Sequence, residues 1–253
     1  MSARRKARNI TVATTLNLGF KGYHQTRQNG GRLFSRQVTM LESKQAIESL
    51  TQPIPVHDAP RKNDLRKILR ARRRALSARH QKQASIGLCR QLARLPAFIR
   101  AHRLAVYIAN DGEIDLQPLI ELAWRLNKLV CLPVLHPFRH GHLLFMPYHP
   151  YQALAYNRFG IPEPLCDHSD LCPVWTLDLV FTPLVGFDSV GNRMGMGGGF
   201  YDRTFSFIDK RTKPHDPILV GVAHECQKVE TIPSEHWDIS MRFIATETST
   251  YRA

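Results

Sequence analysis

Short apolar runs alternate with helical stretches through residues 104–247, and this alternation limits the folds open to the chain. "LAVYIA" precedes the helical pattern "DLQPLIELAWRLNK", and the runs "LVCLPVL", "LLFMPY", "LDLVFTPLV", "ILVGVA" and "RFIATE" follow. Runs rich in Val, Ile, Leu and Phe are typical of strands buried on both faces, as in parallel sheets covered by helices. The sequence therefore predicts an α/β fold with a mainly parallel sheet and helices on both faces.

The domain organisation follows from where this pattern begins. We see no internal repeat and no break in the pattern that would suggest a second domain, so we expect a single domain over residues 59–248. Residues 1–58 mix Arg, Thr, Gln, Asn and Gly with only short apolar runs, which predicts a weakly ordered, basic N-terminal extension. A start codon assigned too early, with the genuine start near Met40 or later, is an alternative explanation of this segment.

The net charge of +14 raises the question of nucleic acid, but the charge is unevenly distributed. Residues 61–103 carry 14 basic side chains and 1 acidic side chain, whereas residues 104–253 carry 12 basic and 17 acidic. A uniformly basic binding domain does not have this distribution. We therefore do not expect nucleic acid as the partner, although binding through residues 1–103 stays open as an alternative.

The basic segment "RKNDLRKILRARRRALS" predicts an amphipathic helix. Leu65, Leu69 and Leu76 share one side, and basic residues recur every four positions on another. These basic residues are Lys62, Arg66, Arg70 and Arg74. Ser77 can cap a second helix, which ends before Pro96. The simplest interpretation of the basic side is a solvated face, so a phosphate-binding role requires independent evidence of an anion site.

That evidence comes from "GNRMGMGGGFYDRTF", residues 191–205, which has five glycines in its first nine positions. It follows a predicted strand and leads into a predicted helix, where parallel sheets bind ligands. Glycines permit positive φ and let several backbone amides converge on one anion. Neither GxxxxGK[ST] nor GxGxxG fits the segment. Asp202 would repel phosphate unless a magnesium ion lay between them, and Asp238 could complete such a site.

Other combinations of reactive side chains carry less weight. His136, His140 and His142 lie close together, but Gly141 indicates a hairpin turn and no fourth ligand has suitable spacing. Cys226 beside His224 could form a thiol–imidazole pair, although a buried cysteine is the commoner outcome.

Cellular location is read from features the sequence lacks. The five cysteines include no CxxC pair, so neither a disulfide framework nor a thiolate zinc site is indicated. No apolar run approaches the length of a membrane span, and the N-terminus lacks the apolar stretch of a secretory signal. We therefore expect a cytoplasmic protein without membrane contacts. We also expect a monomer, although none of these features bears on the oligomeric state.

Four motifs between about Lys62 and Thr246 stand out together: "KNDLRKILRARRRALS", "NDGEIDLQPLI", "PLVGFDSVGNRMGMGGGFYDRTF" and "HECQKVETIPSEHWDI". In combination they resemble the 5-formyltetrahydrofolate cyclo-ligase family, also called 5,10-methenyltetrahydrofolate synthetases, with the bacterial members most similar. The resemblance implies a fold like that of NagB, RpiA and CoA transferases. It also implies cyclisation of 5-formyltetrahydrofolate to 5,10-methenyltetrahydrofolate, with ATP as cosubstrate, Mg²⁺ as cofactor, and ADP and phosphate as products.

The resemblance also implies roles for residues by motif position. Lys62 and Arg66 match the nucleotide-binding basic pair, and Asp202 and Asp238 match the magnesium positions. The ATP loop comprises Arg193, Met194, Gly195, Met196, Gly197, Gly198, Gly199, Phe200 and Tyr201. Arg193, Tyr201 and Asp202 are the expected catalytic residues. The folate positions are Asn110, Glu113 and Asp115, together with Met196, Gly197, Gly198, Gly199 and Phe200 and the turn "FGIPEP" at residues 159–164.

Glu113 and Asp115 also have a reading that does not depend on the family. Both open a predicted helix after a strand, where a carboxylate can bond the donor-rich pterin edge or simply cap the helix.

The chain departs from the family where some members carry a basic residue in the glycine loop. Met196 and Gly198 stand there, so ATP contacts are expected to depend more on Arg193 and the basic helix. A different α/β enzyme that acts on a phosphorylated metabolite stays open as an alternative, because one fold hosts many chemistries.

Overall fold

The structure, a computed structural model, describes residues 62–165, 170–208, 216–235 and 238–253. The predicted extension over residues 1–58 lies outside these residues. None of the helices that the described residues form combines the length and the apolar character needed to span a membrane.

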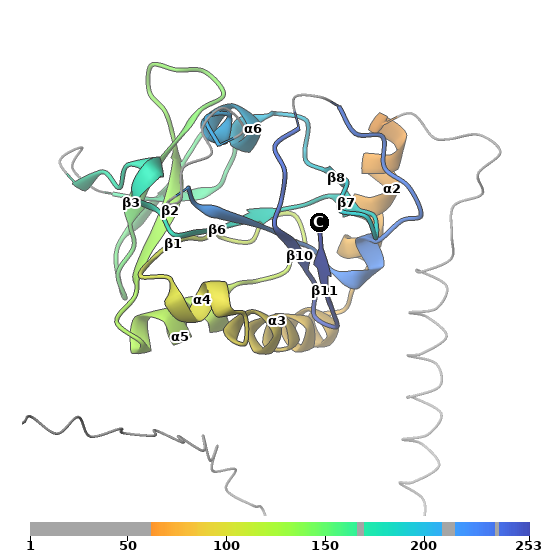
Figure 1. The fold of residues 1–253 in the computed structure, drawn as a ribbon, viewed down its shortest axis with the longest axis horizontal. Coiled ribbons are helices and arrows are strands. Elements are labelled where there is room, and N and C mark those ends of the chain that lie inside the picture. Colours follow the sequence, from red (N-terminus) through yellow and green to blue (C-terminus); the bar gives the residue numbers. More distant parts are fainter. Residues whose placement is uncertain (1–61, 166–169, 209–215, 236–237) are drawn as a thin grey trace, which may run out of the picture. The chain divides into compact units, whose positions relative to one another are not determined.

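A seven-stranded sheet forms the centre of the domain, in the order β11-β10-β9-β6-β1-β2-β3 (Figure 1). Its strands are β1 (Arg103–Ala105), β2 (Leu129–Leu135), β3 (Leu143–Pro147), β6 (Leu179–Pro183), β9 (Ile218–Val222), β10 (Phe243–Ala245) and β11 (Thr250–Arg252). The five inner strands pair in parallel, and β3 and β11 pair antiparallel at the two edges. The predicted mainly parallel sheet is confirmed. The sheet continues past residue 248, the expected end of the domain, because β11 pairs with β10.

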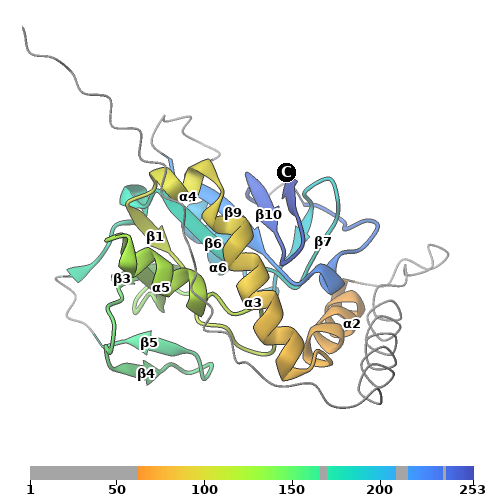
Figure 2. The same ribbon diagram turned by 90° about the horizontal axis from the view of Figure 1, so that it is seen from below.

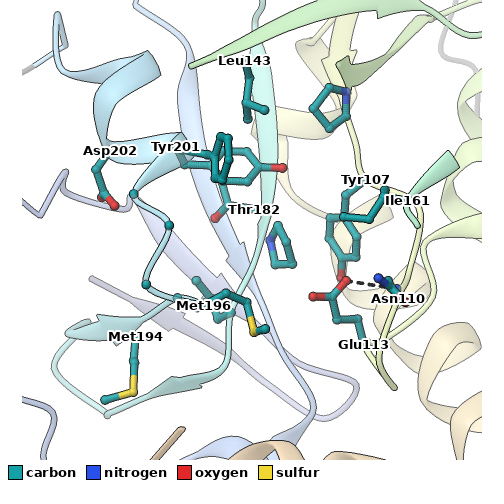
Figure 3. Close-up of a pocket in the computed structure, with 18 of the residues that line it drawn as sticks. Tyr107, Asn110, Glu113, Leu143, Ile161, Thr182, Met194, Met196, Tyr201 and Asp202 are labelled. Atoms are coloured by element: carbon teal, nitrogen blue, oxygen red, sulfur yellow. Dashed lines mark hydrogen bonds between the residues drawn. The ribbon is translucent and has the colours of Figure 1, made fainter. Parts of the chain in front are cut away.

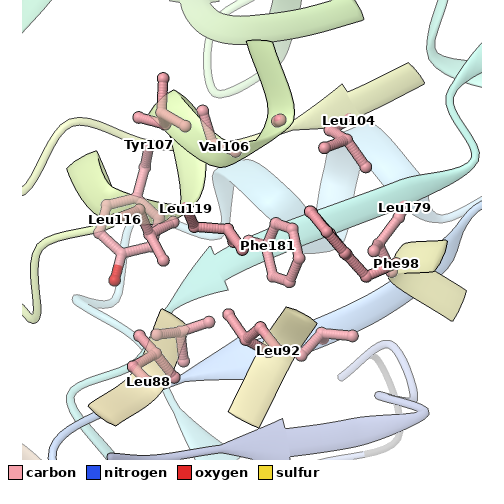
Figure 4. Close-up of a cluster of buried hydrophobic side chains, with 14 of the residues drawn as sticks. Leu88, Leu92, Phe98, Leu104, Val106, Tyr107, Leu116, Leu119, Leu179 and Phe181 are labelled. Atoms are coloured by element: carbon pink, nitrogen blue, oxygen red, sulfur yellow. The ribbon is translucent and has the colours of Figure 1, made fainter. Parts of the chain in front are cut away.

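The inner strands are buried on both faces because their side chains alternate between two cores. Leu179 and Phe181 of β6 lie in a core that also contains Leu88 and Leu92 (Figure 4). Val180, between them in sequence, lies in the opposite core with Phe205. This alternation explains why the strands appear in the sequence as unbroken apolar runs.

Helices cover both faces of the sheet, as predicted (Figure 1). α3 (Ala78–Ala93), α4 (Pro96–Arg100) and α5 (Gln117–Arg125) pack on one face. α6 (Phe200–Phe205) covers part of the other. Ser77 caps α3 as predicted, since its hydroxyl accepts a hydrogen bond from the amide of His80 at 3.3 Å.

The basic helix α2 (Lys62–Arg74) packs beside the segments that follow β6. Leu65 and Leu69 are buried against Val185, Met194 and Ile232.

The prediction that Leu76 extends this apolar side is wrong, because α2 ends at Arg74. Arg73, one turn after Leu69, takes the next buried position and is 0 % exposed.

Two small antiparallel pairs complete the domain. β4 (Leu154–Tyr156) and β5 (Pro162–Pro164) form an arm that projects from the main sheet (Figure 2). β7 (Gly186–Phe187) and β8 (Arg193–Met194) form a hairpin that leads into the glycine segment. Two 3₁₀ turns, η2 (Val174–Thr176) and η3 (Glu225–Gln227), precede β6 and follow β9.

Candidate active site

A cavity of about 1300 Å³ lies at the carboxyl ends of β1, β2 and β6. Figure 3 shows Met194, Met196 and Asp202 on one side of it, Tyr107, Asn110 and Glu113 on the other, and Thr182 between them. The cavity is lined by every site residue expected from the sequence except Asp115 and, within the turn at residues 159–164, Gly160 and Pro164. Ligand pockets typically measure roughly 300–1000 Å³. The cavity is therefore large enough for two substrates.

The glycine segment forms one wall of the cavity and exposes its backbone there. Gly197 and Gly199 have φ of 91° and 61°, values that side chains disfavour. Among the described residues, none accepts a hydrogen bond from the amides of residues 195–199. These amides are therefore available to an anionic ligand.

The basic helix contributes a second wall, so its basic side is not merely a solvated face. Lys62, Arg66, Arg70 and Arg73 line the cavity. Nε of Arg66 donates a hydrogen bond to the carbonyl of Gly195 at 3.0 Å. A Cβ on Gly197 would lie 3.4 Å from the Arg66 guanidinium carbon. Arg66 thus brings positive charge to a loop that has no basic residue between Met194 and Gly199.

Asp202 lies in the first turn of α6 and is paired with Arg193. Nη2 of Arg193 lies 2.6 Å from Oδ1 of Asp202, and the Arg193 side chain is only 10 % exposed. The same carboxylate oxygen lies 3.4 Å from the amide of Ile239, which adjoins Asp238. The two predicted magnesium ligands therefore lie in adjacent segments. Within the described ranges, no group of three His, Cys, Asp or Glu side chains is arranged to hold a metal ion.

The loop after β1 supplies the wall opposite the glycine segment. Oε2 of Glu113 accepts a hydrogen bond from the amide of Asn110 at 3.1 Å. Burial raises the pKa of Glu113, and the positive charge of Arg73 opposes this rise. Asp115 does not line the cavity, because it is exposed and its carboxylate accepts a hydrogen bond from the amide of Gln117 at the start of α5. Asp115 therefore bonds the first amide of α5, whereas Glu113 lines the cavity.

The rest of the lining is mainly apolar. It includes Leu135, Leu143, Phe159, Ile161, Phe200 and Met241. Desolvation, followed by the charge of Glu113, raises the pKa of Tyr201, so its hydroxyl remains a hydrogen-bond donor at neutral pH.

The expected "FGIPEP" turn forms part of the arm that closes one side of the cavity. Its Glu163 holds the arm to β2 by accepting a hydrogen bond from the amide of Leu135 at 2.9 Å.

Sequence reasoning missed several residues of the lining. Arg73, Thr182, Arg203 and Met241 line the cavity, although none of them was among the site residues expected from the sequence. For Arg73 a signal was available, because it continues the four-residue spacing of Leu65 and Leu69.

The other reactive side chains lie mostly away from the cavity. Of the three histidines in the β2–β3 hairpin, only His142 lines it. Cys226 is buried, and burial raises its pKa to about 12, so the thiol is a poor nucleophile.

Comparison with known proteins identifies the family. The model of the 5-formyltetrahydrofolate cyclo-ligase family matches residues 58–247. The chain belongs to this family. It is 47 % identical over 180 residues to the 5-formyltetrahydrofolate cyclo-ligase of Escherichia coli K12, a match that covers 71 % of this chain and 96 % of that protein. The Haemophilus influenzae cyclo-ligase is 42 % identical over 181 residues, covering 72 % and 95 %.

Solved structures agree with this assignment. The NMR structure of Aquifex aeolicus 5,10-methenyltetrahydrofolate synthetase is 31 % identical and covers 76 % of this chain and 92 % of its own, with a TM-score of 0.63. A 5,10-methenyltetrahydrofolate synthetase from Mycoplasma pneumoniae has the same fold, with a TM-score of 0.58 at 20 % identity and coverage of 74 % and 99 %. The cyclo-ligase family resemblance is confirmed, whereas the likeness to NagB, RpiA and CoA transferases stays a prediction.

Proposed function

We propose that this cavity binds ATP and 5-formyltetrahydrofolate together and closes the folate to 5,10-methenyltetrahydrofolate, releasing ADP and phosphate. Family membership makes the chain an ATP-dependent cyclo-ligase. One observation carries the assignment of the site. The glycine segment and the basic helix meet a buried carboxylate, Glu113, in one cavity large enough for both substrates.

The reaction requires activation of a poor electrophile. The formamide oxygen is a poor leaving group and N10 is a weak nucleophile. Transfer of the γ-phosphoryl group of ATP to the formyl oxygen breaks the bond to the bridging oxygen of ADP and gives an imidate-like phosphate. N10 then attacks the formyl carbon and loses its proton, and the C–O bond breaks to release phosphate. The protein's task is mainly positioning and charge neutralisation.

The nucleotide side of the cavity consists of the glycine segment and the positive charges that face it. The free amides of residues 195–199 bind phosphate oxygens, and Lys62, Arg66 and Arg193 neutralise their charge. Lys62 can exchange its present partner, Glu235 at 2.8 Å, for a phosphate oxygen, because their ion pair is partly exposed and therefore weak. The Tyr201 hydroxyl, which stays protonated, can donate a hydrogen bond to a transferring oxygen.

Asp202 and Asp238 fit a magnesium site. Mg²⁺ is usually held by one or two carboxylates together with substrate phosphates and water, so a pair of acids without a third protein ligand is suitable. The assignment is supported because the amide of Ile239 lies 3.4 Å from Oδ1 of Asp202, and Asp202 and Asp238 both line the cavity beside the glycine segment. A bound Mg²⁺ supplies charge neutralisation and orientation of phosphates. Arg193 now pairs with Asp202, and a bound Mg²⁺ would compete with Arg193 for that carboxylate.

The folate side consists of Asn110, Glu113 and the apolar wall from β2 and the arm. The Glu113 carboxylate accepts hydrogen bonds from the donor-rich edge of the pterin, and the apolar wall packs against the ring. Asp115 has no part in this proposal, because it does not line the cavity.

A cytoplasmic enzyme is consistent with the cysteines, since the four within the described ranges are free thiols. The prediction of a monomer is checked by size-exclusion chromatography with light scattering.

A spectrophotometric assay tests the function directly. Purified protein with 5-formyltetrahydrofolate, ATP and Mg²⁺ should generate the methenyl product, whose absorbance is distinct, and should release ADP and phosphate in equal amounts. Omission of ATP should abolish product formation. Phosphate binding without ATP turnover would instead favour an enzyme of a phosphorylated metabolite. Strong, steeply salt-dependent retention on polyanions by the chain without residues 1–58 would favour a nucleic-acid binder.

A further inference from the structure

Arg73 is a buried arginine at the point where three parts of the cavity wall meet. Its side chain is 0 % exposed. Nε donates a hydrogen bond to the carbonyl of Asp111 at 2.9 Å, and Nη1 donates to the carbonyl of Leu184 at 3.3 Å. Nη2 lies 3.0 Å from Oδ2 of Asp111 and 3.6 Å from Oε1 of Glu113. Arg73 thereby joins α2 to the loop after β1 and to the end of β6.

The loop that Arg73 holds has an unusual backbone. Asp111 and Gly112 both have positive φ, 53° and 75°. A Cβ on Gly112 would lie 3.4 Å from the carbonyl oxygen of Arg73 and from Cα of Arg74. The loop therefore approaches the end of α2 so closely that glycine is favoured there. Contacts must hold such a conformation, because non-glycine residues seldom adopt positive φ.

The two carboxylates beside Arg73, those of Asp111 and Glu113, differ in how many basic partners they have. Burying an ion costs several kcal/mol unless it is paired and hydrogen-bonded. Asp111 has two further basic partners, since Nε of Arg70 lies 2.7 Å from its Oδ2 and Arg74 also contacts it. Among the basic side chains of the described residues, only Arg73 forms an ion pair with Glu113.

We propose that Arg73 is a positioning residue for the folate: it pairs with Glu113 and fixes residues 110–113 against α2, so that the carboxylate faces the pterin. This inference rests on the proposed function, because it takes Glu113 to contact the folate. Arg73 acts through Glu113 and needs no contact with substrate of its own.

The electrostatic surroundings of Glu113 agree with this role. Burial raises its pKa, and Arg73 is the largest influence that lowers it. Arg70 of α2 acts in the same direction, whereas Asp111 acts against it. The hydroxyls of Tyr107, after β1, and Tyr201, on α6, also feel the charge of Glu113. Removal of Arg73 therefore favours protonation of Glu113. The protonated carboxyl carries an O–H donor, which does not match the hydrogen-bond donors of the pterin edge.

The test is Arg73→Met, which keeps an apolar stem of similar length and removes the charge. We expect the KM for 5-formyltetrahydrofolate to rise about tenfold below neutral pH, and the acid limb of kcat/KM for folate to move up by about one pH unit. The KM for ATP should stay within about twofold. Lys67→Met is the matched control, because it removes one charge from an exposed site on the same helix. The proposal would be overturned if the acid limb of kcat/KM for folate did not move, or if the KM values for folate and ATP rose equally.

A double mutant separates this role from general loosening of the fold. In a Glu113→Gln background, Arg73→Met should no longer shift the acid limb, because the group that titrates is gone. A shift that persists there contradicts the proposal. If Arg73→Met does not fold in a thermal melt, Arg73→Lys replaces it, and the retained charge should leave the limb where it is in the wild type. A limb displaced in Arg73→Lys counts against the role. Wild-type product formation in the same assay tests the proposed function separately.

Discussion

Asp202→Asn is the perturbation that most directly tests the nucleotide side of the cavity. The substitution keeps the side chain's shape but removes the charge that pairs with Arg193 across 2.6 Å. A hydrogen bond to a charged group is worth about 1.5–3 kcal/mol and a neutral one about 0.5–1.5 kcal/mol. The folded state should therefore lose roughly 1–2 kcal/mol, a fall in Tm of roughly 2–8 °C for a domain of this size.

The expected effect on catalysis is larger than the effect on stability. Removal of one preorganised electrostatic group from an active site typically lowers kcat by about 10²–10³, or about 2.7–4 kcal/mol. We expect a loss of this size in formation of the methenyl product, together with a higher Mg²⁺ concentration for half-maximal rate. Initial rates measured by absorbance across a Mg²⁺ titration give both quantities.

Asp64→Asn is the control for this experiment, because it makes the same change at an acid of α2 that is 54 % exposed. It should leave the rate and the Mg²⁺ midpoint unchanged. A rate for Asp202→Asn within threefold of wild type, with the same Mg²⁺ midpoint, would refute the assignment of Asp202. The assignment would also be refuted if the loss of activity only matched the fraction of protein that is unfolded at the assay temperature.

Three further predictions concern α2 and the residues it contacts. Lys62→Ala should raise the KM for ATP about tenfold and leave the KM for folate unchanged, because ATP is the only one of the two substrates that loses a partner. Steady-state kinetics test this, and a rise in the KM for folate alone would contradict the role. Leu69→Ala should lower the free energy of unfolding, measured in urea, by about 2–5 kcal/mol, since Leu69 is 0 % exposed. A change below about 1 kcal/mol would contradict this and would mean that the residues around Leu69 repack into the space. For Asp111, burial acts to raise the pKa, but hydrogen bonds from Arg70, Arg74 and Arg73 outweigh it and lower the pKa from 3.8 to about 2. Because the folded value lies below the ordinary one, the stabilisation is present above about pH 4 and disappears toward pH 2. Thermal melts of wild type and Asp111→Asn should converge there, and a constant difference would contradict the assignment.

The main strands were predictable because a strand buried on both faces appears in the sequence as an unbroken apolar run. β2 has the same bounds as the apolar run "LVCLPVL". β11 leaves no such trace, because Thr250 and Arg252 are exposed and Tyr251 is only half-buried. The hydroxyl of Tyr251 donates a hydrogen bond to Oε1 of Glu225 at 2.5 Å, a contact between distant segments. An edge strand held by such contacts cannot be recognised from apolar spacing.

The site was predictable where a motif has a local pattern and unpredictable where tertiary packing decides. The four-residue spacing of Lys62 and Arg66 and the run of glycines both identified parts of the cavity wall. Glu113 and Asp115 lie two residues apart in one loop, and only the fold decides which of them enters the cavity. Arg73 was missed because a charged side chain is normally expected in water, and its burial depends on carboxylates from another segment.

The concentration of positive charge along one helix has a consequence for how the enzyme is handled. Both proposed substrates are anions, and Lys62, Arg66 and Arg70 line the cavity that would admit them. The attraction that speeds their entry weakens as the Debye length falls from about 10 Å at 0.1 M salt to about 3 Å at 1 M. Sulfate and phosphate buffers will compete for the same amides and guanidinium groups, so rates measured in them will understate the activity seen at low ionic strength.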